Sequence, residues 1–174
     1  MPNQEHWLVE EAGRRLPHGA TGELVVRGSH VMQGYWERPE ETAERLRPGP
    51  LPGQTVLHTG DLFRSDAEGY LYFVARRDDI IKTRGEKVAP REVENALYRL
   101  EGVTGCAVVG VPDELLGQAV KAYVTLAPGC TLGEREIIRH CLAHLESHMA
   151  PKSVAIVAEL PHTESGKIRH ASLR

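Results

Sequence analysis

The hydrophobic pattern divides the chain into a β-rich first part and a mixed second part. Residues 22–28 (GELVVRG) form a short β-branched run between glycines, and residues 70–74 (YLYFV) follow an Asp-Ala-Glu-Gly turn as the return arm of a hairpin. A short helix is expected over 39–46, and the Pro- and Gly-rich stretch 47–53 indicates a loop that neither a helix nor a central strand could tolerate. This pattern suits a small barrel or a meander, and we expect a partial β-barrel-like subdomain over residues 1–77.

The periodicity changes after this part. Two short strands are expected around Gly85, and Pro90 opens a helix whose apolar residues recur at helical spacing. Four further elements are expected: a near-continuous apolar strand at 106–111, an alternating strand at 120–126, a second helix at 133–148 and a strand at 154–158. The alternating strand implies a sheet with one face towards water. Residues 78–174 are therefore expected to form a small α+β lid domain, and the chain as a whole belongs to the α+β class.

Composition and charge limit the kind of partner. The 174 residues are 41% hydrophobic, which is enough for a packed core. The net charge is only −3, from 21 basic and 24 acidic residues that are interspersed along the chain. Neither a nucleic acid nor an anionic membrane surface is therefore expected as a partner. The apolar runs are strand-sized and no signal-peptide pattern is present, so we expect a cytoplasmic protein without membrane insertion.

The cysteines do not form a disulfide framework. They are odd in number and include no C-x-x-C pair: Cys106, Cys130 and Cys141. Such a pattern predicts reduced thiols.

Three histidines raise the question of a metal site. His140, His144 and His148 recur at every fourth residue of the predicted second helix, which is metal-ligand spacing on one helical face. They lie beside the apolar stripe, and no fourth ligand is apparent. A solvated helix flank is therefore favoured over zinc, and no metal held by the protein is expected.

The tail carries a lysine in a loop. Residues 160–169 (LPHTESGKIR) place Lys167 directly after a turn of small residues, where Pro161 and Gly166 set the backbone. A compact ammonium on a long stem suits reaching a phosphate or carboxylate oxygen. Taken alone, the same lysine is better explained as an ordinary solvated residue, and only its context can favour the functional role.

The tripeptide Thr59-Gly-Asp61 offers a second candidate group. It is expected at the end of a strand-like segment, where a fixed carboxylate can accept hydrogen bonds from two neighbouring hydroxyls, as in a ribose diol. The alternative is a turn aspartate satisfied by its own backbone. The densely charged stretch 76–88 that follows is either a solvated linker or a hinge.

Taken in order, five segments resemble the carboxyl-terminal third of the adenylate-forming superfamily, which includes acyl-CoA synthetases, adenylation domains of nonribosomal peptide synthetases and firefly luciferase. The segments are GELVVRGSHVMQGYWERPEETAERL from Gly22, TGDL from Thr59, YFVARRDDIIKTRGEKVAPREVE from Tyr72, CAVVGVPDELLGQAVKAYV from Cys106 and LPHTESGKIR from Leu160. They cover nearly the whole chain, and collinear motifs are more specific than any single one.

The resemblance assigns a role to each candidate residue. It implies that Asp61 and Arg76 hold the ribose hydroxyls of ATP or AMP. Asp78 matches the hinge, and the loop at Gly85 matches the one that approaches the pantetheine arm. Lys167 matches the catalytic lysine, which bridges the substrate carboxylate and the α-phosphate while charge develops on their oxygens.

The resemblance also implies a two-step ligation. ATP, accompanied by Mg²⁺, and a small-molecule carboxylic acid give acyl-AMP and pyrophosphate, after which coenzyme A takes the acyl group. Coenzyme A is expected because RGEKVAPREVE resembles free-standing acyl-CoA ligases and no carrier module follows Lys167 in the chain. The alternatives are an adenylation domain that loads a carrier-protein phosphopantetheine thiol, and a non-catalytic stand-alone domain that acts through a partner.

The chain departs from the family pattern in two ways. Ala75 occupies a position where most members have glycine. The triphosphate-binding loop and the acyl pocket would precede Gly22, where the sequence has only 21 residues. We therefore expect the carboxyl-terminal part of a ligase whose large N-terminal domain is missing, and we do not expect full activity from it alone.

Overall fold

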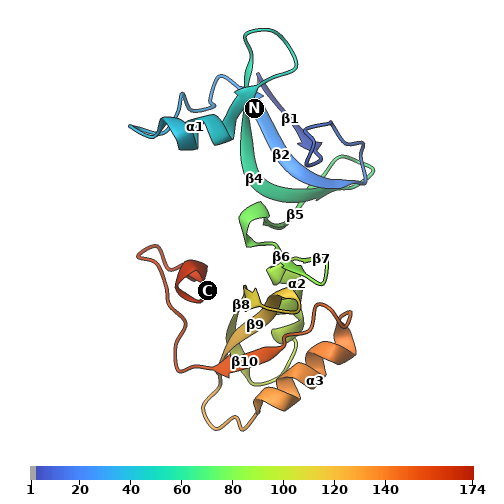
Figure 1. The fold of residues 1–174 in the computed structure, drawn as a ribbon, viewed down its shortest axis with the longest axis vertical. Helices are drawn as coiled ribbons and strands as arrows, with labels where there is room; N and C mark the ends of the chain where they lie inside the picture. Colours follow the sequence, from blue (N-terminus) through green and yellow to red (C-terminus); the bar gives the residue numbers. More distant parts are fainter. Residues whose placement is uncertain (1–2) are drawn as a thin grey trace. The chain divides into compact units, whose positions relative to one another are not determined.

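The structure, a computed structural model, describes residues 3–174, so the first two residues of the predicted first part lie outside the described residues. The chain divides into two compact units, Met1–Asp78 and Asp79–Arg174. This division lies one residue later than the expected one. Figure 1 shows the order of the elements along the chain.

The first unit is built on one curled five-stranded sheet with one helix. Its elements are β1 (Gln4–Val9), β2 (Thr21–Gly28), α1 (Pro39–Arg45), β3 (Leu46–Pro48), β4 (Thr55–Ser65) and β5 (Leu71–Arg76), and a 3-10 turn, η1 (Arg77–Asp79), begins at its end. Strand β4 has β2 along one edge and β3 and β5 in succession along the other, and all pairs are antiparallel. Figure 1 shows β2 and β4 as long bent ribbons. The predicted partial barrel is therefore confirmed.

The predicted loop and the predicted strand end in this unit need correction. Strand β3 lies within the stretch expected to be a loop, and Pro48 is tolerated because β3 is an edge strand. The strand that contains Thr59 and Asp61 continues to Ser65, so the expectation that Asp61 ends a strand is wrong. Gly60 adopts a left-handed φ of 75° and lets the strand bend and continue.

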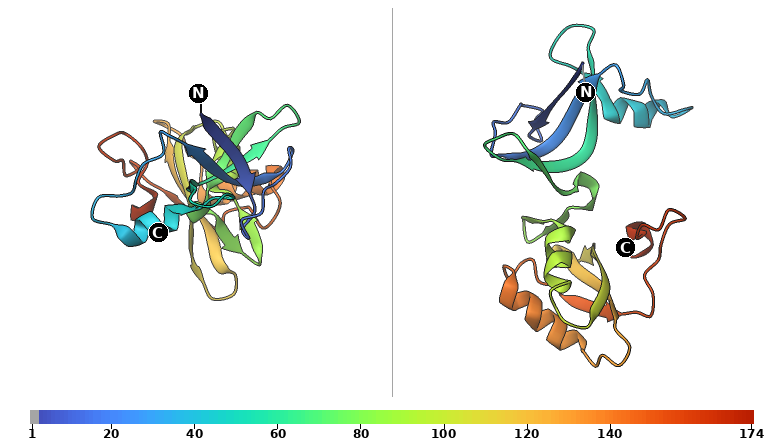
Figure 2. Two further views of the ribbon diagram at one scale, coloured as in Figure 1. Left: turned by 90° about the horizontal axis from the view of Figure 1, so that it is seen from above. Right: turned by 180° about the vertical axis from the view of Figure 1, so that it is seen from behind.

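The second unit is also built on a five-stranded sheet. Its elements are β6 (Ile81–Thr83), β7 (Glu86–Val88), α2 (Pro90–Leu97), β8 (Val103–Asp113), β9 (Gly117–Leu126), α3 (Glu134–His144), β10 (Ser153–Ile156) and a 3-10 turn, η2 (His170–Ser172). Strand β9 pairs with β8 on one edge and with β10 and β6 on the other, and the β9–β10 pair is parallel. Helix α3, orange in Figure 2, packs against β10 and α2. The α+β class is confirmed.

The core of the second unit lies between its two helices and one face of its sheet. The helices contribute Val93, Leu97, Ile137 and Cys141, and the two long strands contribute Cys106, Val108, Val120, Ala122 and Val124. These strand residues recur at every second position, so they share one face. At the alternate positions of β8, Ala107 and Val109 are also buried, and η2 contacts this strand. On β9, Lys121 and Tyr123 are partly exposed, as the alternating pattern predicts.

The second predicted helix of this unit is shorter than expected. Helix α2 ends at Leu97, and α3 ends at His144 because Leu145 is extended, with φ −130° and ψ 161°. His148 therefore lies outside the helix. Within residues 3–174 no helix has both the length and the apolar content needed to cross a membrane.

Candidate functional site

Asp61 and Arg76 form an ion pair across two neighbouring strands. They are register partners of β4 and β5, and Arg76 Nη1 lies 3.0 Å from Asp61 Oδ1. The side chains are 28% and 48% exposed, so the pair is accessible from solvent. Thr59 Oγ1 accepts the Asp61 backbone N–H at 3.1 Å and donates to the Leu24 carbonyl at 2.8 Å. The aspartate is therefore anchored from both its backbone and its side chain.

The glycine between Thr59 and Asp61 is required by its surroundings. Gly60 has a φ of 75°, which side chains rarely adopt, and a Cβ atom there would overlap the Arg45 guanidinium. Arg45 Nη2 in turn donates to Asp78 Oδ2 at 3.1 Å. The predicted hinge residue is thus held by an arginine that packs over the turn before Asp61.

A buried carboxylate that sequence reasoning missed lies beneath this pair. The Glu23 side chain is only 7% exposed. Its Oε1 accepts the Gly60 N–H at 2.9 Å, and its Oε2 accepts from Arg77 Nη1 at 3.2 Å and lies 3.1 Å from His58 Nδ1. The sequence shows Glu23 only as a charged residue inside the apolar strand 22–28. The partners of Glu23 are 35 or more residues away along the chain, so a local pattern does not reveal them.

Lys167 lies on a short hairpin of the second unit. The Thr163 N–H donates to the Lys167 carbonyl at 2.7 Å, the Lys167 N–H donates to Thr163 Oγ1 at 3.1 Å, and His162 and Ile168 form an antiparallel bridge. Gly166 closes the turn with a φ of 79°. The Lys167 side chain is exposed, as expected for a loop that reaches another surface.

Gly85 lies at the tip of the β6–β7 hairpin. The paired residues Thr83 and Glu86 enclose a two-residue turn in which Arg84 and Gly85 have φ values of 54° and 85°. Positive φ at both positions is typical of a type I′ hairpin turn. A Cβ atom on Gly85 would meet nothing within 4 Å, so the tip is open. The two short strands expected around Gly85 are confirmed.

The candidate residues are distributed over both units. The structure brings Asp61 and Arg76 together, and it places Asp78 at the last position of the first unit. Gly85 and Lys167 belong to the second unit. The roles assigned to these five residues stay predictions.

The histidines on α3 contact the backbone and one another. His140 Nε2 lies 2.9 Å from the Ala96 carbonyl oxygen, and His144 Nδ1 lies 2.8 Å from the His140 carbonyl oxygen. Their rings are stacked, with 4.3 Å between centroids. Across the part of the chain that the structure describes, no group of three or more His, Cys, Asp or Glu side chains is arranged to hold a metal ion.

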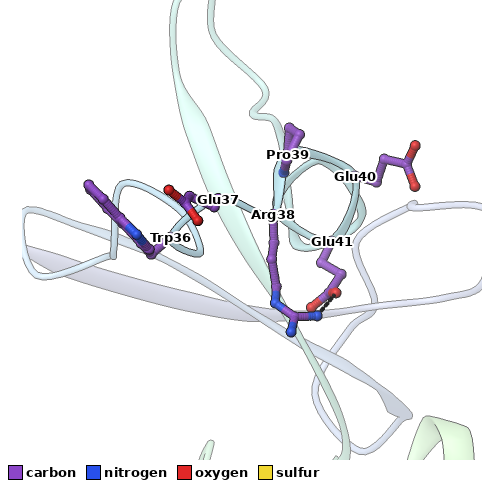
Figure 3. A pocket seen from close by; sticks show the side chains of 6 residues that line it. All are labelled: Trp36, Glu37, Arg38, Pro39, Glu40 and Glu41. Carbon is purple, nitrogen blue, oxygen red and sulfur yellow. Dashed lines mark hydrogen bonds and ion pairs between the residues drawn. The ribbon is translucent and has the colours of Figure 1, made fainter.

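The main hollows do not coincide with the candidate residues. One hollow, about 700 Å³, is lined by residues 36–41 at the start of α1. Figure 3 shows Arg38 turned towards Glu41 there, with 2.5 Å between Arg38 Nη1 and Glu41 Oε1. Two others, about 400 and 280 Å³, lie on the first unit. None of these three hollows is lined by a candidate residue.

Comparison with known proteins shows which proteins the chain is similar to. Residues 92–167 match the family described as "AMP-binding enzyme C-terminal domain". Feruloyl-CoA synthase of an Amycolatopsis species is 42% identical over 167 residues, which cover 96% of this chain and 33% of that protein. A long-chain-fatty-acid–CoA ligase of Escherichia coli O6:H1 is 38% identical over 100% of this chain and 30% of its own length. The chain thus spans about a third of the length of the curated relatives it matches.

Solved structures agree with this similarity. ATP-bound MatB from Rhodopseudomonas palustris aligns with 100% of this chain and 34% of its own, with a TM-score of 0.91 and 32% identity. The apo structure of MatB aligns over the same shares with a TM-score of 0.65. The chain is therefore similar throughout to the C-terminal third of CoA ligases and other adenylate-forming enzymes, and its residues 92–167 match the AMP-binding enzyme C-terminal domain.

Proposed function

We propose that this chain supplies the C-terminal third of an AMP-forming ligase that activates a carboxylic acid with ATP and transfers the acyl group to coenzyme A. The observation that carries the proposal is the accessible Asp61–Arg76 pair, in a chain 42% identical to a feruloyl-CoA synthase. Like its activity, the location of this ligase is a proposal: we place it in the cytoplasm, where ATP and coenzyme A are available.

The Asp61 carboxylate binds the ribose of ATP. A vicinal diol presents two hydroxyl donors, and a carboxylate can accept both. Arg76 fixes one oxygen of Asp61 and adds its own donors at the same place. The Thr59 hydroxyl holds the backbone below, so the carboxylate is oriented before the nucleotide arrives.

Lys167 stabilises the charge that develops when the acyl-adenylate forms. Its ammonium is carried on an exposed hairpin that hydrogen bonds with Thr163 keep closed. A positioned ammonium beside the carboxylate and the α-phosphate lowers the barrier because charge grows on those oxygens in the transition state.

Mg²⁺ accompanies ATP in the proposed reaction as a counter-ion of its phosphates. Residues 3–174 offer no group of three or more carboxylates or imidazoles for it. We assign no residue of this chain and no step of the reaction to this ion.

Asp78 is the pivot between the two half-reactions. The part of R. palustris MatB that aligns with this chain differs in conformation between its ATP-bound and apo structures, since their TM-scores are 0.91 and 0.65. This difference supports a pivot in the corresponding segment. After rotation, the open tip at Gly85 approaches the pantetheine arm of coenzyme A.

Coenzyme A is preferred to a carrier-protein thiol as the acyl acceptor. The curated relatives reported above are a CoA synthase and a CoA ligase, and both match over nearly the whole chain. We therefore test the proposal with free coenzyme A.

The proposal is tested in a chimera in which this chain replaces the matched third of the Amycolatopsis feruloyl-CoA synthase. With ferulate and ATP, the chimera is expected to release pyrophosphate and to form feruloyl-CoA. Lys167→Ala is expected to slow pyrophosphate release by about 100-fold or more, the size of effect seen when one transition-state donor is removed. Lys121→Ala, which removes a lysine that lies over Tyr123 on the surface of β9, is the matched control and keeps full activity.

Two results would contradict parts of the proposal. An active chimera in which Lys167→Ala equals the unmutated protein would remove the catalytic role of Lys167. A folded chimera that releases no pyrophosphate, beside a parent synthase that does, would favour the non-catalytic domain over the ligase.

A further inference from the structure

One buried side chain contacts the neighbours of both proposed ribose-binding residues. The Glu23 carboxylate accepts the Gly60 N–H at 2.9 Å and Arg77 Nη1 at 3.2 Å. Gly60 directly precedes Asp61, and Arg77 directly follows Arg76. A single residue of β2 is therefore linked to β4 and to the end of β5, at the point where the Asp61–Arg76 pair forms.

The strand pairing explains why a side chain is needed there. The register of β2 against β4 shifts between Glu23 and Val25, whose partners are Leu62 and His58. Three residues of β4 therefore face one residue of β2. The Gly60 N–H lies in this irregular stretch and is satisfied by the carboxylate of Glu23.

Burial makes this arrangement costly to lose. A carboxylate that is 7% exposed is tolerated only when its oxygens are paired, and both oxygens of Glu23 have partners. His58, whose side chain is 10% exposed, lies 3.1 Å from Oε2. An apolar residue at position 23 would leave the Gly60 N–H and the His58 ring without this acceptor.

The two consecutive arginines have separate partners. Arg76 pairs with Asp61, and Arg77 pairs with Glu23. Arg76 is the last residue of β5 and Arg77 is the first residue of the turn η1. One arginine therefore reaches the exposed carboxylate of Asp61, and the other reaches the buried carboxylate of Glu23.

We infer that Glu23 is a positioning residue for the nucleotide: through Gly60 and Arg77 it holds Asp61 and Arg76 in the register that a ribose diol requires. This inference rests on the proposed function for the role of Asp61 and Arg76. Glu23 itself does not touch the nucleotide.

The first test measures the KM for ATP in the chimera. Glu23→Gln keeps the size of the side chain but leaves one acceptor oxygen. The site has a donor for each oxygen of Glu23, the Gly60 N–H for Oε1 and Arg77 Nη1 for Oε2. The KM for ATP is expected to rise about tenfold, as for the loss of one charge-assisted hydrogen bond, while the KM for ferulate stays unchanged. Glu10→Gln, which breaks the exposed Glu10–Arg14 pair of the same unit, is the matched control and changes neither constant.

A double-mutant cycle shows whether Glu23 acts through Arg77. Arg77→Met is expected to raise the KM for ATP about as much as Glu23→Gln, and the double variant is expected to be no worse than the more affected single variant. Additive effects would overturn the inference, because the two residues would then act independently.

The second test needs no activity and uses the 174-residue chain. Amide hydrogen exchange of Gly60, followed by NMR, is expected to be about tenfold faster in Glu23→Gln, with no change in Glu10→Gln. If the exchange rate of the Gly60 amide is unchanged in Glu23→Gln, the inference is overturned. It is also overturned if this exchange is faster but the KM for ATP of the Glu23→Gln variant of an active chimera is unchanged. If the unmutated chimera is inactive, the proposed function fails and the exchange result alone decides whether Glu23 holds this turn.

Discussion

Arg76 and Asp61 face each other across the β4–β5 pair, with 3.0 Å between Nη1 and Oδ1. Directly opposed residues of an antiparallel pair have their Cβ atoms about 4.5–5.5 Å apart, so strand register sets this distance. The pair is accordingly more rigid than one built on two loops. If Asp61 binds a ribose, the binding group is fixed before the ligand arrives.

The first prediction concerns the Asp61 carboxylate. Asp61→Asn keeps the shape of the side chain but leaves it with one acceptor oxygen, so it can no longer serve both Arg76 and a diol. In the chimera, kcat/KM for ATP is expected to fall by about 10- to 100-fold. Steady-state pyrophosphate release at varied ATP measures this. Glu68→Gln, an exposed change in the turn before β5, is the control, and an unaltered kcat/KM in Asp61→Asn would exclude ribose binding by this residue.

The second prediction concerns the pivot. Asp78→Pro fixes φ and is expected to spare pyrophosphate release while it depresses feruloyl-CoA formation, because rotation between the half-reactions is restricted. Asp78→Ala is the matched control, since it removes the contact with Arg45 but leaves the backbone free to rotate. The two half-reactions are measured separately. Equal losses of both in Asp78→Pro would argue against a hinge.

The third prediction concerns the thiols. Burial raises the pKa of Cys106 to about 12 and that of Cys141 to about 11, whereas Cys130 is partly exposed. Because the thiolate is the reactive form, native protein at pH 8 is expected to react with iodoacetamide at Cys130 alone. Intact-mass analysis counts the added groups. Denatured protein is the control and is expected to add three iodoacetamide groups. Rapid addition of three groups to the native chain would contradict the prediction, because it would show that Cys106 and Cys141 are accessible.

The fourth prediction concerns pH and stability. Burial raises the pKa of Glu94 above its ordinary 4.5, opposed by the hydrogen bond that its Oε1 accepts from the Val108 N–H at 3.0 Å. A raised pKa means that the folded state binds the proton more tightly. The stability from this group is therefore fully present below 4.5 and is lost as the pH rises through the folded pKa.

Glu94→Gln removes this titration while it keeps an acceptor for Val108. The free energy of unfolding of the variant, relative to the original chain, is expected to increase as the pH rises above 4.5. Urea titrations at several pH values measure the difference. A difference that is constant with pH, or that shrinks as the pH rises, would show that Glu94 does not titrate in this way.

The fifth prediction concerns the core of the second unit. Ile137 is fully buried between α3 and the sheet, and Ile137→Ala is expected to lower the free energy of unfolding by about 2–5 kcal/mol. Leu142→Ala, on the same helix but 52% exposed, is the control and is expected to cost about 1 kcal/mol or less. Urea unfolding followed by circular dichroism compares them, and equal costs would show that Ile137 is not in a packed core.

Local patterns predicted most of the fold. The strand over 22–28, the hairpin around Gly85 and the starts of both helices of the second unit follow from glycines, prolines and apolar spacing, which act over a few residues. Strand β3 was missed because it is three residues long and contains a proline, so its identity depends on its partner β4. The helix expected to reach His148 ends at His144 instead, although the apolar spacing continues beyond it.

The site was only partly predictable. Asp61 and Arg76 were found through motifs, and the structure pairs them. The prediction that Asp61 ends a strand is wrong because a glycine such as Gly60 occurs both at the end of a strand and at a bend within one. Glu23 was missed because a single charged residue in a strand gives no sign of whether it is buried, and its three partners come from β4 and from the turn after β5.

Strand β9 connects the two loops of the second unit that carry Gly85 and Lys167. The β6–β7 hairpin with Gly85 meets β9 at Gly117, and β10, which leads towards Lys167, pairs with the same edge at residues 121–124. Any rigid displacement of this sheet therefore moves both loops by the same rotation. For the proposed ligase, a single rotation of this unit therefore repositions the Lys167 ammonium and the hairpin tip at Gly85 together.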